Sequence, residues 1–247
     1  MEDSFFDVHT HMLPGVDDGA KSMAQTSAML DMAYAEGMRR IFFTPHYGLY
    51  NENICAEAFQ SVFREVKEAF LTRYEDMELY LGNELFYGPE TVSALQEGKA
   101  LRMADTDYVL VEFHPAEDYS TIEKAVQSLV LAGYRPVIAH AERYLCLRKY
   151  PADAEELVYR GARIQVNSGS LLKGPLDGGF RLIRRLLKDD LVHFLGSDCH
   201  NDRDRKPQMK ATAEKLRQMT GKEQAERILR GNGERLLRNQ PVGPIEI

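Results

Sequence analysis

Histidine and acidic residues gather at the ends of short apolar runs in this chain of 247 residues. The pair His9 and His11 ends the first run, and Asp198 and His200 follow the last one. Residues two positions apart on a strand share a face, so the members of each pair are expected to point in the same direction. Imidazole and carboxylate groups are the usual ligands of divalent ions such as zinc, manganese and iron. The sequence therefore predicts a multinuclear metal site.

Further candidate ligands end the runs that lie between these two pairs. Glu84 and Glu112 each follow an apolar stretch, where a carboxylate is costly unless it is paired or bound to a metal. Asp17 and Asp18 lie in a loop, and turn formation is an equal alternative for them. The candidate ligands are thus His9, His11, His46, Glu84, Glu112, His140, Asp198 and His200, with either Asp17 or Asp18.

Two other histidines and two arginines lie near these positions. His193 is inside an apolar run, which favours a structural or supporting role, whereas His114 follows Glu112 by two residues and could reach the site. Arg143 and Arg205 closely follow two of the candidate ligands. Guanidinium groups bind phosphate in a bidentate manner, so arginines at the rim of a metal cluster would suit a phosphate. The alternative for both is an ordinary solvated surface arginine.

Apolar runs of strand length alternate with amphipathic stretches of helix length along the chain. This alternation predicts parallel strands in an α/β fold, and the number of strands favours a TIM-like barrel of about seven units. Active sites of such barrels lie at the carboxyl ends of the strands, where nearly every candidate ligand is found. The predicted strands are 5–9, 40–44, 78–81, 108–113, 136–140, 162–166 and 191–195. The predicted helices are 23–36, 56–73, 122–131, 154–160, 180–187, 207–219 and 222–238.

Length and composition favour a single domain over residues 1–247, because an α/β barrel typically has about this size. A formal net charge of −7 argues against a nucleic-acid partner, whose phosphates require a basic surface. The three cysteines form no CxxC pair, which suits a reducing cytoplasm and argues against a disulfide framework. The sequence predicts neither a signal peptide nor a membrane-spanning segment.

Seven stretches of the sequence carry a more specific pattern. They run through nearly the whole chain, and the combination of VDDG with AHAERY is the most distinctive. Together they resemble the PHP superfamily, and more closely its bacterial capsule-type protein-tyrosine phosphatases. The matching stretches are DVHTHMLPGVDDGAKS at 7–22, TPH at 44–46, GNE at 82–84, VEF at 111–113, VIAHAERY at 137–144, QVNSGSL at 165–171 and LGSDCHN at 195–201.

The resemblance implies a distorted (β/α)7 TIM-like barrel, the PHP fold, that holds three divalent ions. Manganese is the expected ion, with iron, zinc or magnesium as alternatives. The resemblance also favours Asp18 over Asp17 as a ligand. The implied ligand groups are His9, His11, Glu84 and Asp198 for one ion, Glu84, Glu112 and His140 for a second, and Asp18, His46 and His200 for the third.

The resemblance further implies an enzyme, a metal-dependent protein-tyrosine phosphatase located in the cytoplasm. The implied substrate is the tyrosine-rich tail of a bacterial kinase that controls the synthesis and export of capsule or exopolysaccharide. Arg143 and Arg205 match the positions that hold the phosphate, although Arg203 is a nearby competitor. His114 matches no ligand of the family.

Charge and leaving-group chemistry agree with a phosphomonoester substrate. Three divalent ions would bring about +6 and four carboxylates about −4, so the cluster stays positive even with a bridging hydroxide. The hypothesis is an in-line attack on phosphorus by a metal-bound hydroxide, since metal binding lowers the pKa of water to about 7. A tyrosine phenolate, whose conjugate acid has a pKa of about 10, leaves without a strong general acid.

Three other functions need to be distinguished from this one. Cys199 and Arg205 satisfy the CxxxxxR pattern of cysteine-dependent phosphatases, but Asp202 and Asp204 between them would repel phosphate. Cys199 also alternates with two candidate ligands, so it should face away from the site. A second alternative keeps the metals and changes the substrate to histidinol phosphate, a nucleic acid or an amide. The third is a metal-binding scaffold without catalysis.

Overall fold

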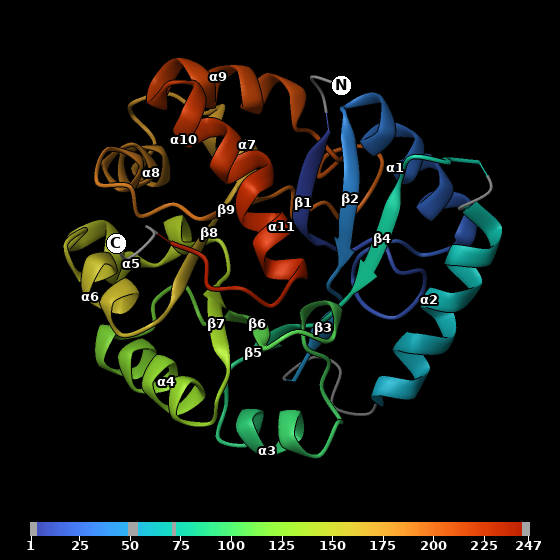
Figure 1. The fold of residues 1–247 in the computed structure, drawn as a ribbon, viewed down its shortest axis with the longest axis horizontal. Coiled ribbons are helices and arrows are strands. Elements are labelled where there is room, and N and C mark those ends of the chain that lie inside the picture. The colour runs from blue at the N-terminus through green and yellow to red at the C-terminus, as the bar shows by residue number, and fades with distance from the viewer. Residues whose placement is uncertain (1–3, 49–53, 71–72, 244–247) are drawn as a thin grey trace.

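The computed structural model describes residues 4–48, 54–70 and 73–243 and shows a mixed α/β fold (Figure 1). Every strand pair within these residues is parallel. One sheet has the order β1-β2-β4, and the other has the order β3-β5-β6-β7-β8-β9. The strands are β1 (Phe5–Thr10), β2 (Met38–Phe43), β3 (His46–Tyr47), β4 (Glu78–Leu81), β5 (Glu84–Phe86), β6 (Tyr108–Glu112), β7 (Arg135–Ile138), β8 (Arg163–Asn167) and β9 (Phe194–Gly196).

The two sheets meet on both sides, so that the strands curl around a common interior. β2 leads into β3, and β4 leads into β5, each after a break of two residues. Across this break the backbone N–H of Glu84 donates to the carbonyl of Pro45 at 3.1 Å. On the other side, Thr10 at the end of β1 forms a parallel bridge with Cys199, just beyond β9. The carboxyl ends of the strands therefore lie at one mouth of a curled parallel sheet.

Helices cover the outside of the strands (Figure 1). The first helix begins after Ser22, whose Oγ accepts from the backbone N–H of Gln25 at 3.3 Å. Residues 71 and 72 of the predicted helix 56–73 lie outside the described residues. The sequence prediction missed α3, α5 and α7, which are shorter than the window over which helical periodicity shows. The helices are α1 (Met23–Ala35), α2 (Ala56–Phe70), α3 (Thr91–Gln96), α4 (Tyr119–Leu131), α5 (Leu145–Lys149), α6 (Asp153–Tyr159), α7 (Ser168–Leu171), α8 (Gly178–Lys188), α9 (Lys210–Thr220), α10 (Lys222–Glu226) and α11 (Asn232–Leu237), with 3-10 turns η1 (Met103–Asp105) and η2 (Ala141–Arg143) and a π-helical turn η3 (Arg227–Gly231).

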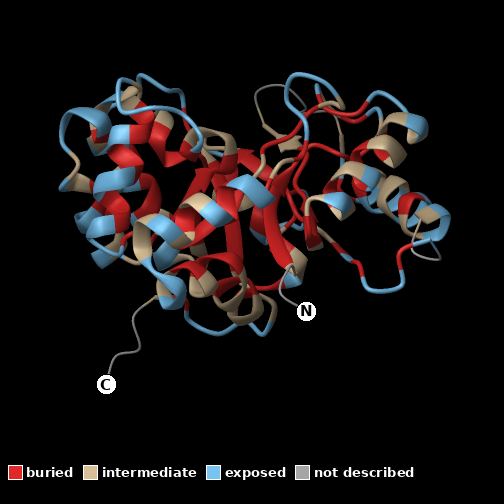
Figure 2. Ribbon diagram, turned by 90° about the horizontal axis from the view of Figure 1, so that it is seen from above, coloured by how far each residue is buried: buried red, intermediate tan, exposed pale blue. Residues whose placement is uncertain are grey.

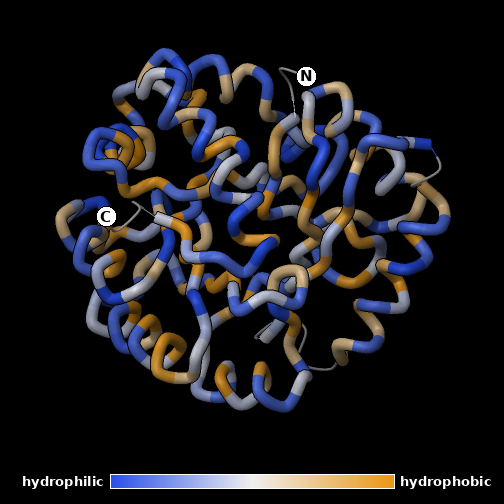
Figure 3. The backbone as a smooth tube through the Cα atoms, viewed as in Figure 1, coloured by the Kyte–Doolittle hydropathy of each residue, from blue (hydrophilic) through white to orange (hydrophobic). Residues whose placement is uncertain are grey.

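Most strand residues are buried, which explains why apolar residues predominate in the strands. Alternate residues of β6 serve two cores. Val109 and Val111 pack in the larger core under the outer helices, and Tyr108 and Leu110 pack in a smaller core between the strands. Figure 2 shows the buried residues gathered on the central strands, and Figure 3 shows hydrophobic and hydrophilic residues alternating along the outer helices. Among the described helices, none has the length and apolar character that a membrane crossing requires.

Two strands end before the candidate ligands that the sequence placed on them or in line with them. β7 ends at Ile138, and His140 follows with φ 34°. β9 ends at Gly196, and Asp198 follows with φ 53°. Asp198 and His200 therefore lie in the segment beyond β9 and not on a strand, but their side chains still share one side, as predicted, and Cys199 between them points into the core. Left-handed backbone at a residue other than glycine costs about 1–2 kcal/mol, so tertiary contacts must hold these turns.

His193, just before β9, is a buried histidine with a structural role. Its Nδ1 accepts from the backbone N–H of Ile164 at 3.1 Å. Burial lowers the pKa of His193 from 6.5 to about 3. The unfolded chain therefore binds one more proton than the folded chain between these two pH values. Acidification through this window destabilises the fold by up to about 1.4 kcal/mol per pH unit at this residue.

We expect the free energy of unfolding to fall as the pH is lowered from 6.5 towards 4, and to fall less steeply for His193→Asn. Asparagine does not titrate, and its side-chain oxygen can still accept the hydrogen bond from Ile164. Urea titrations of both proteins at several pH values measure the two slopes. Equal slopes would show that His193 does not titrate on unfolding.

Candidate metal centre

The predicted ligands converge on one cleft at the carboxyl ends of the strands. The cleft has a volume of about 600 Å³. Its lining includes both predicted arginines and seven of the predicted ligands, namely Asp18, His46, Glu84, Glu112, His140, Asp198 and His200. His9 and His11 are fully buried and reach this cluster through Glu84. The prediction that residues far apart in the chain meet at one mouth of the sheet is confirmed.

His9 and His11 turn their Nε2 atoms toward each other, with 3.1 Å between them. The other ring nitrogens have partners outside the cluster. His9 Nδ1 lies 3.1 Å from Gln165 Oε1, and His11 Nδ1 donates to Asp17 Oδ2 at 2.7 Å. Two imidazole nitrogens at this separation need a proton or a metal ion between them, because two lone pairs would otherwise repel each other. Burial opposes protonation of His11, but Asp17 outweighs burial and raises the pKa of His11 to about 9.

Glu84 lies at the centre of the cluster and is only 1% exposed. Its Oε1 is 3.1 Å from His9 Nε2 and 2.9 Å from His140 Nε2. Its Oε2 is 3.2 Å from His11 Nε2 and 3.0 Å from His46 Nδ1. Burial disfavours the charged form, but His9 and the other rings outweigh burial and hold the pKa of Glu84 well below its usual range. An ionised carboxylate that faces four imidazoles is suited to bridge two cations.

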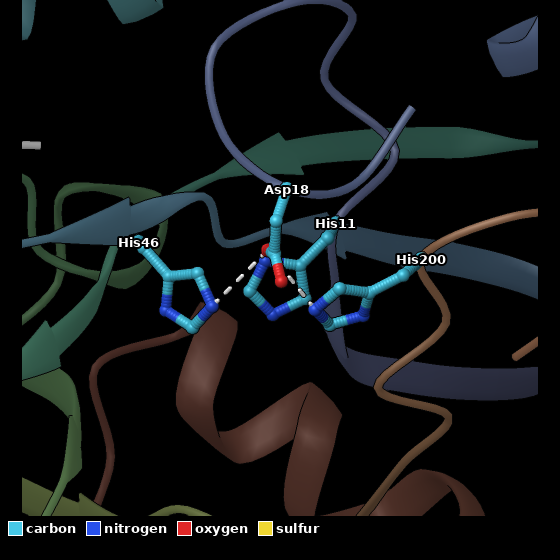
Figure 4. A group of neighbouring side chains, drawn as sticks. All are labelled: His11, Asp18, His46 and His200. Carbon is cyan, nitrogen blue, oxygen red and sulfur yellow. Dashed lines mark ion pairs between the residues drawn. The ribbon is translucent and has the colours of Figure 1, made fainter. Parts of the chain in front are cut away.

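Asp18 lies between two imidazoles (Figure 4). Its Oδ1 is 3.4 Å from His46 Nε2 and 3.3 Å from His200 Nε2. These contacts, with His200 first and His46 second, hold the pKa of Asp18 below its usual range. Asp17 instead contacts the outer nitrogen of His11 and accepts from the backbone N–H of His46 at 3.2 Å. Asp18 therefore shares the pair of rings at the cleft, and Asp17 supports the ligands around it.

Glu112, at the end of β6, adds a second carboxylate beside Glu84. Its Oε1 is 3.1 Å from His46 Nδ1, and its Oε2 is 3.5 Å from His140 Nε2. Burial and the charge of Glu84 oppose ionisation of Glu112, but His140 and His46 outweigh them and lower its pKa. Burial likewise opposes protonation of His140, and the two carboxylates raise its pKa to about 9. This part of the site also stabilises positive charge.

Asp198 receives hydrogen bonds from both predicted arginines. Arg143 Nη2 donates to Asp198 Oδ2, and Arg205 Nη2 donates to Asp198 Oδ1 at 2.8 Å. Asn167 Nδ2 also donates to Oδ2, at 2.8 Å. Burial opposes ionisation of Asp198, but His9 and then Arg143 hold its pKa below the usual range. The side chains of Arg143 and Arg205 are 39% and 42% exposed, so both also reach the open side of the cleft.

Three overlapping groups among the described side chains have the spacing of metal ligands. In each group the donor atoms lie within 4.8 Å of one another. Their mixture of imidazole nitrogen and ionised carboxylate oxygen suits divalent manganese, iron or zinc, so the residues fit such ions. The groups differ from the implied sets at three points: Asp198 is not in the first group, His46 stands where His140 was expected in the second, and His11 joins the third. The groups are His9, His11 and Glu84; His46, Glu84 and Glu112; and His11, Asp18, His46 and His200.

Three residues whose roles the sequence left open or excluded lie outside these groups, namely His114, Arg203 and Cys199. His114 lines the mouth of the cleft, where its Nδ1 accepts from the backbone N–H of Ala116 at 3.2 Å. Among the described residues, Arg205 lines the cleft and Arg203 does not. Cys199 is fully buried in the apolar core, as the alternation of side chains predicted, and burial raises the pKa of its thiol.

Sequence reasoning missed the support that Gln165 and Asn167 give to the ligands. Gln165 Nε2 donates to Asn167 Oδ1 at 2.9 Å, and both side chains contact candidate ligands. The two residues lie two positions apart on β8 and therefore share a face. The available signal was a pair of amide side chains inside an otherwise apolar strand.

One family model and several characterised relatives match nearly the whole chain. The family model for capsular polysaccharide synthesis, CpsB/CapC, matches residues 5–238. The tyrosine-protein phosphatase YwqE of Bacillus subtilis is 35% identical over 244 residues, with 96% of this chain and 92% of YwqE covered. The tyrosine-protein phosphatase CpsB of Streptococcus agalactiae is 29% identical over 245 residues, with 96% of this chain and 99% of CpsB covered.

Solved structures agree with the sequence matches. One chain comes from crystal structures of YwqE from Bacillus subtilis and CpsB from Streptococcus pneumoniae, described as unique metal-dependent tyrosine phosphatases. It matches with a TM-score of 0.86 at 32% identity, covering 98% of this chain and 100% of that chain. A histidinol phosphate phosphatase from Lactococcus lactis matches with a TM-score of 0.59 at 14% identity over 88% of this chain and 92% of that chain, which shows a shared fold alone. The chain therefore belongs to the capsular polysaccharide synthesis CpsB/CapC family.

Proposed function

We propose that this protein is a metal-dependent protein-tyrosine phosphatase. The observation that carries the proposal is Glu84, a buried ionised carboxylate that faces four imidazoles in a cleft lined by two arginines. Family membership supports phosphotyrosine as the substrate, since YwqE and CpsB are tyrosine-protein phosphatases. The alternative substrate, a small phosphomonoester such as histidinol phosphate, is supported by a shared fold alone.

We propose that the cluster holds three divalent ions, with manganese as the first candidate and iron, zinc or magnesium as alternatives. The overlap of the three donor groups at Glu84, His11 and His46 supports several ions placed close together. The proposed ligands are His9, His11, Glu84 and Asp198 for one ion, Glu84, Glu112 and His140 for a second, and Asp18, His46 and His200 for the third, with His46 also near Glu84 and Glu112.

The side chains of the cleft would bind and orient the phosphate monoester. When bound, divalent ions lower the pKa of coordinated water to about 7 and offset the charge of the phosphate. Arg143 and Arg205 each use an Nη2 on Asp198, which fixes their orientation. Their remaining guanidinium N–H groups are the donors that we assign to the phosphate oxygens. The phenolate of tyrosine has a conjugate acid with a pKa of about 10, so we assign no general acid.

The natural substrate that we propose is phosphotyrosine in the tail of a kinase that controls capsule or exopolysaccharide synthesis. The family is named for capsular polysaccharide synthesis, which supports this setting. A cytoplasmic location is supported by the three cysteines, Cys55, Cys146 and Cys199, all of which are free thiols.

We also propose that residues 1–247 form one domain with a distorted (β/α)7 barrel. β2 with β3 and β4 with β5 then count as two interrupted strands, which reduces the nine strands to seven positions. The bridge between Thr10 and Cys199 supports closure between the first and last positions.

An assay of the manganese-loaded protein on three substrates tests the proposed function. We expect kcat/KM for a phosphotyrosine peptide to exceed that for histidinol phosphate and for a phosphodiester by at least about tenfold, because phenolate is a better leaving group than an alkoxide. Elemental analysis of the same sample measures the bound metal. Preferred hydrolysis of histidinol phosphate would establish the alternative substrate. Hydrolysis of none of the three would favour a metal-binding scaffold.

A further inference from the structure

The buried amide of Gln165 contacts two proposed ligands and is linked to a third. Its Oε1 accepts from the backbone N–H of His140 at 2.7 Å and lies 3.1 Å from His9 Nδ1. Its Nε2 donates to Asn167 Oδ1 at 2.9 Å, and Asn167 Nδ2 donates to Asp198 Oδ2 at 2.8 Å. One side chain on β8 therefore connects ligands on β1 and beyond β7 and β9.

The directions of these hydrogen bonds determine which nitrogen of His9 faces the cluster. A backbone N–H can only donate, so the Gln165 atom that meets it is the amide oxygen. That oxygen can only accept, so His9 Nδ1 carries the proton. His9 Nε2 then presents its lone pair at 3.1 Å from Glu84 Oε1. A lone pair and a carboxylate oxygen at this distance need a cation between them, and only an unprotonated imidazole nitrogen binds a metal.

Gly196 leaves the space that the amide of Gln165 occupies beside His9. A Cβ built on Gly196 would lie 2.9 Å from Gln165 Nε2 and 2.5 Å from His9 Cβ, closer than real side chains allow. The absence of a side chain at the end of β9 is what lets both groups reach each other. Gln165 and His9 are fully buried, so water does not compete for these hydrogen bonds.

We propose that Gln165 is a positioning residue that holds His9, His140 and Asp198 ready to bind metal. Through its oxygen it fixes the tautomer of His9 and the left-handed turn at His140, and through Asn167 it orients Asp198. The proposal rests on the metal-dependent function proposed above. Partners of this kind contribute about 10–100-fold to metal affinity.

Calorimetric titration of the metal-stripped full chain with Mn²⁺ tests this role. Gln165→Leu removes the acceptor and the donor, and we expect it to weaken Mn²⁺ binding by about 10–100-fold. Gln165→Glu still accepts from both N–H groups, so we expect it to bind Mn²⁺ more tightly than Gln165→Leu. The matched control is Gln224→Leu on α10, which loses hydrogen bonds to Leu187 O and Asp190 Oδ1 at the C-terminal end of α8 and should keep the wild-type affinity.

Thermal unfolding distinguishes a role of Gln165 in positioning the metal ligands from a role in stabilising the fold alone. Added Mn²⁺ raises the melting temperature according to its affinity, so the rise should be smaller in Gln165→Leu than in wild type, whatever their stabilities in chelator. Asn167→Leu removes the donor to Asp198 and the acceptor of Gln165 Nε2, and it leaves the contacts of Gln165 Oε1 in place. It provides the same comparison if Gln165→Leu does not fold. Equal Mn²⁺ affinities in these variants and wild type would overturn the proposal and leave the phosphatase function standing. Failure of the wild type to bind Mn²⁺ would overturn both.

Discussion

Treatment with a chelator is expected to abolish phosphotyrosine hydrolysis by this protein, with a loss of at least about 10³-fold. Charge stabilisation by metal ions is worth several kcal/mol, and about 1.4 kcal/mol corresponds to a factor of ten in rate. No serine or cysteine is among the described residues that line the cleft, so the chain offers no hydroxyl or thiol nucleophile there. Phosphate release from a phosphotyrosine peptide, measured before and after dialysis against a chelator, gives the loss. Readdition of Mn²⁺ should restore the rate.

Cys199→Ser is the control for the chelator experiment, because the CxxxxxR pattern makes Cys199 the nucleophile of the alternative, cysteine-dependent mechanism. We expect this variant to retain its activity per folded molecule, since the thiol is buried in the apolar core and its pKa is raised. Full activity in chelator together with loss of activity in Cys199→Ser would replace the metal mechanism by a cysteine-dependent one.

The regular strands could be predicted because their residue types reflect burial on both faces. β4 has the predicted bounds, and β6 differs from the prediction by one residue at its end. The sequence reasoning missed β3 and β5, which have two and three residues and begin at His46 and Glu84. These strands exist because His46 pairs with Glu84 in register across the sheet. A run of two or three residues is too short to show the alternation of apolar and polar residues from which a strand is predicted, and a pairing between distant segments is not visible in the sequence.

The residue types of the site and their convergence could be predicted from the sequence, but the backbone geometry that positions them could not. Ligands that follow parallel strands must meet at one mouth, so the convergence followed from the fold class alone. The turns at His140 and Asp198 could not be predicted, because left-handed backbone there depends on tertiary contacts such as the hydrogen bond from the His140 N–H to Gln165. Asp17 and Asp18 are adjacent and chemically identical in the sequence. Their residue type and spacing could not separate them, although the family resemblance favoured Asp18; the structure shows that Asp17 contacts His11 and that Asp18 contacts His46.

Glu84→Gln is expected to lower kcat/KM by more than about 100-fold and to reduce the amount of bound metal. Glutamine has nearly the same shape, so the change removes the charge and leaves the packing intact. Loss of groups that only support a metal ligand already costs about 10–100-fold, and Glu84 contacts four imidazoles directly. An amide N–H₂ in this position would also point a donor at cations. Elemental analysis and the phosphotyrosine peptide assay measure the two effects.

Glu36→Gln is the control for the same chemical change outside the cleft. The half-buried Glu36 carboxylate accepts from the backbone N–H groups of Met209 and Lys210 at 3.0 and 2.9 Å, so its replacement tests the general cost of exchanging a hydrogen-bonded carboxylate for an amide. We expect Glu36→Gln to keep its metal content and activity. If Glu84→Gln also kept its metal content and activity, the Glu84 carboxylate could not be a bridging ligand, because the variant lacks the negative charge that a bridge between two cations requires. The cluster would then have to hold its ions through Glu112, Asp18 and Asp198 alone.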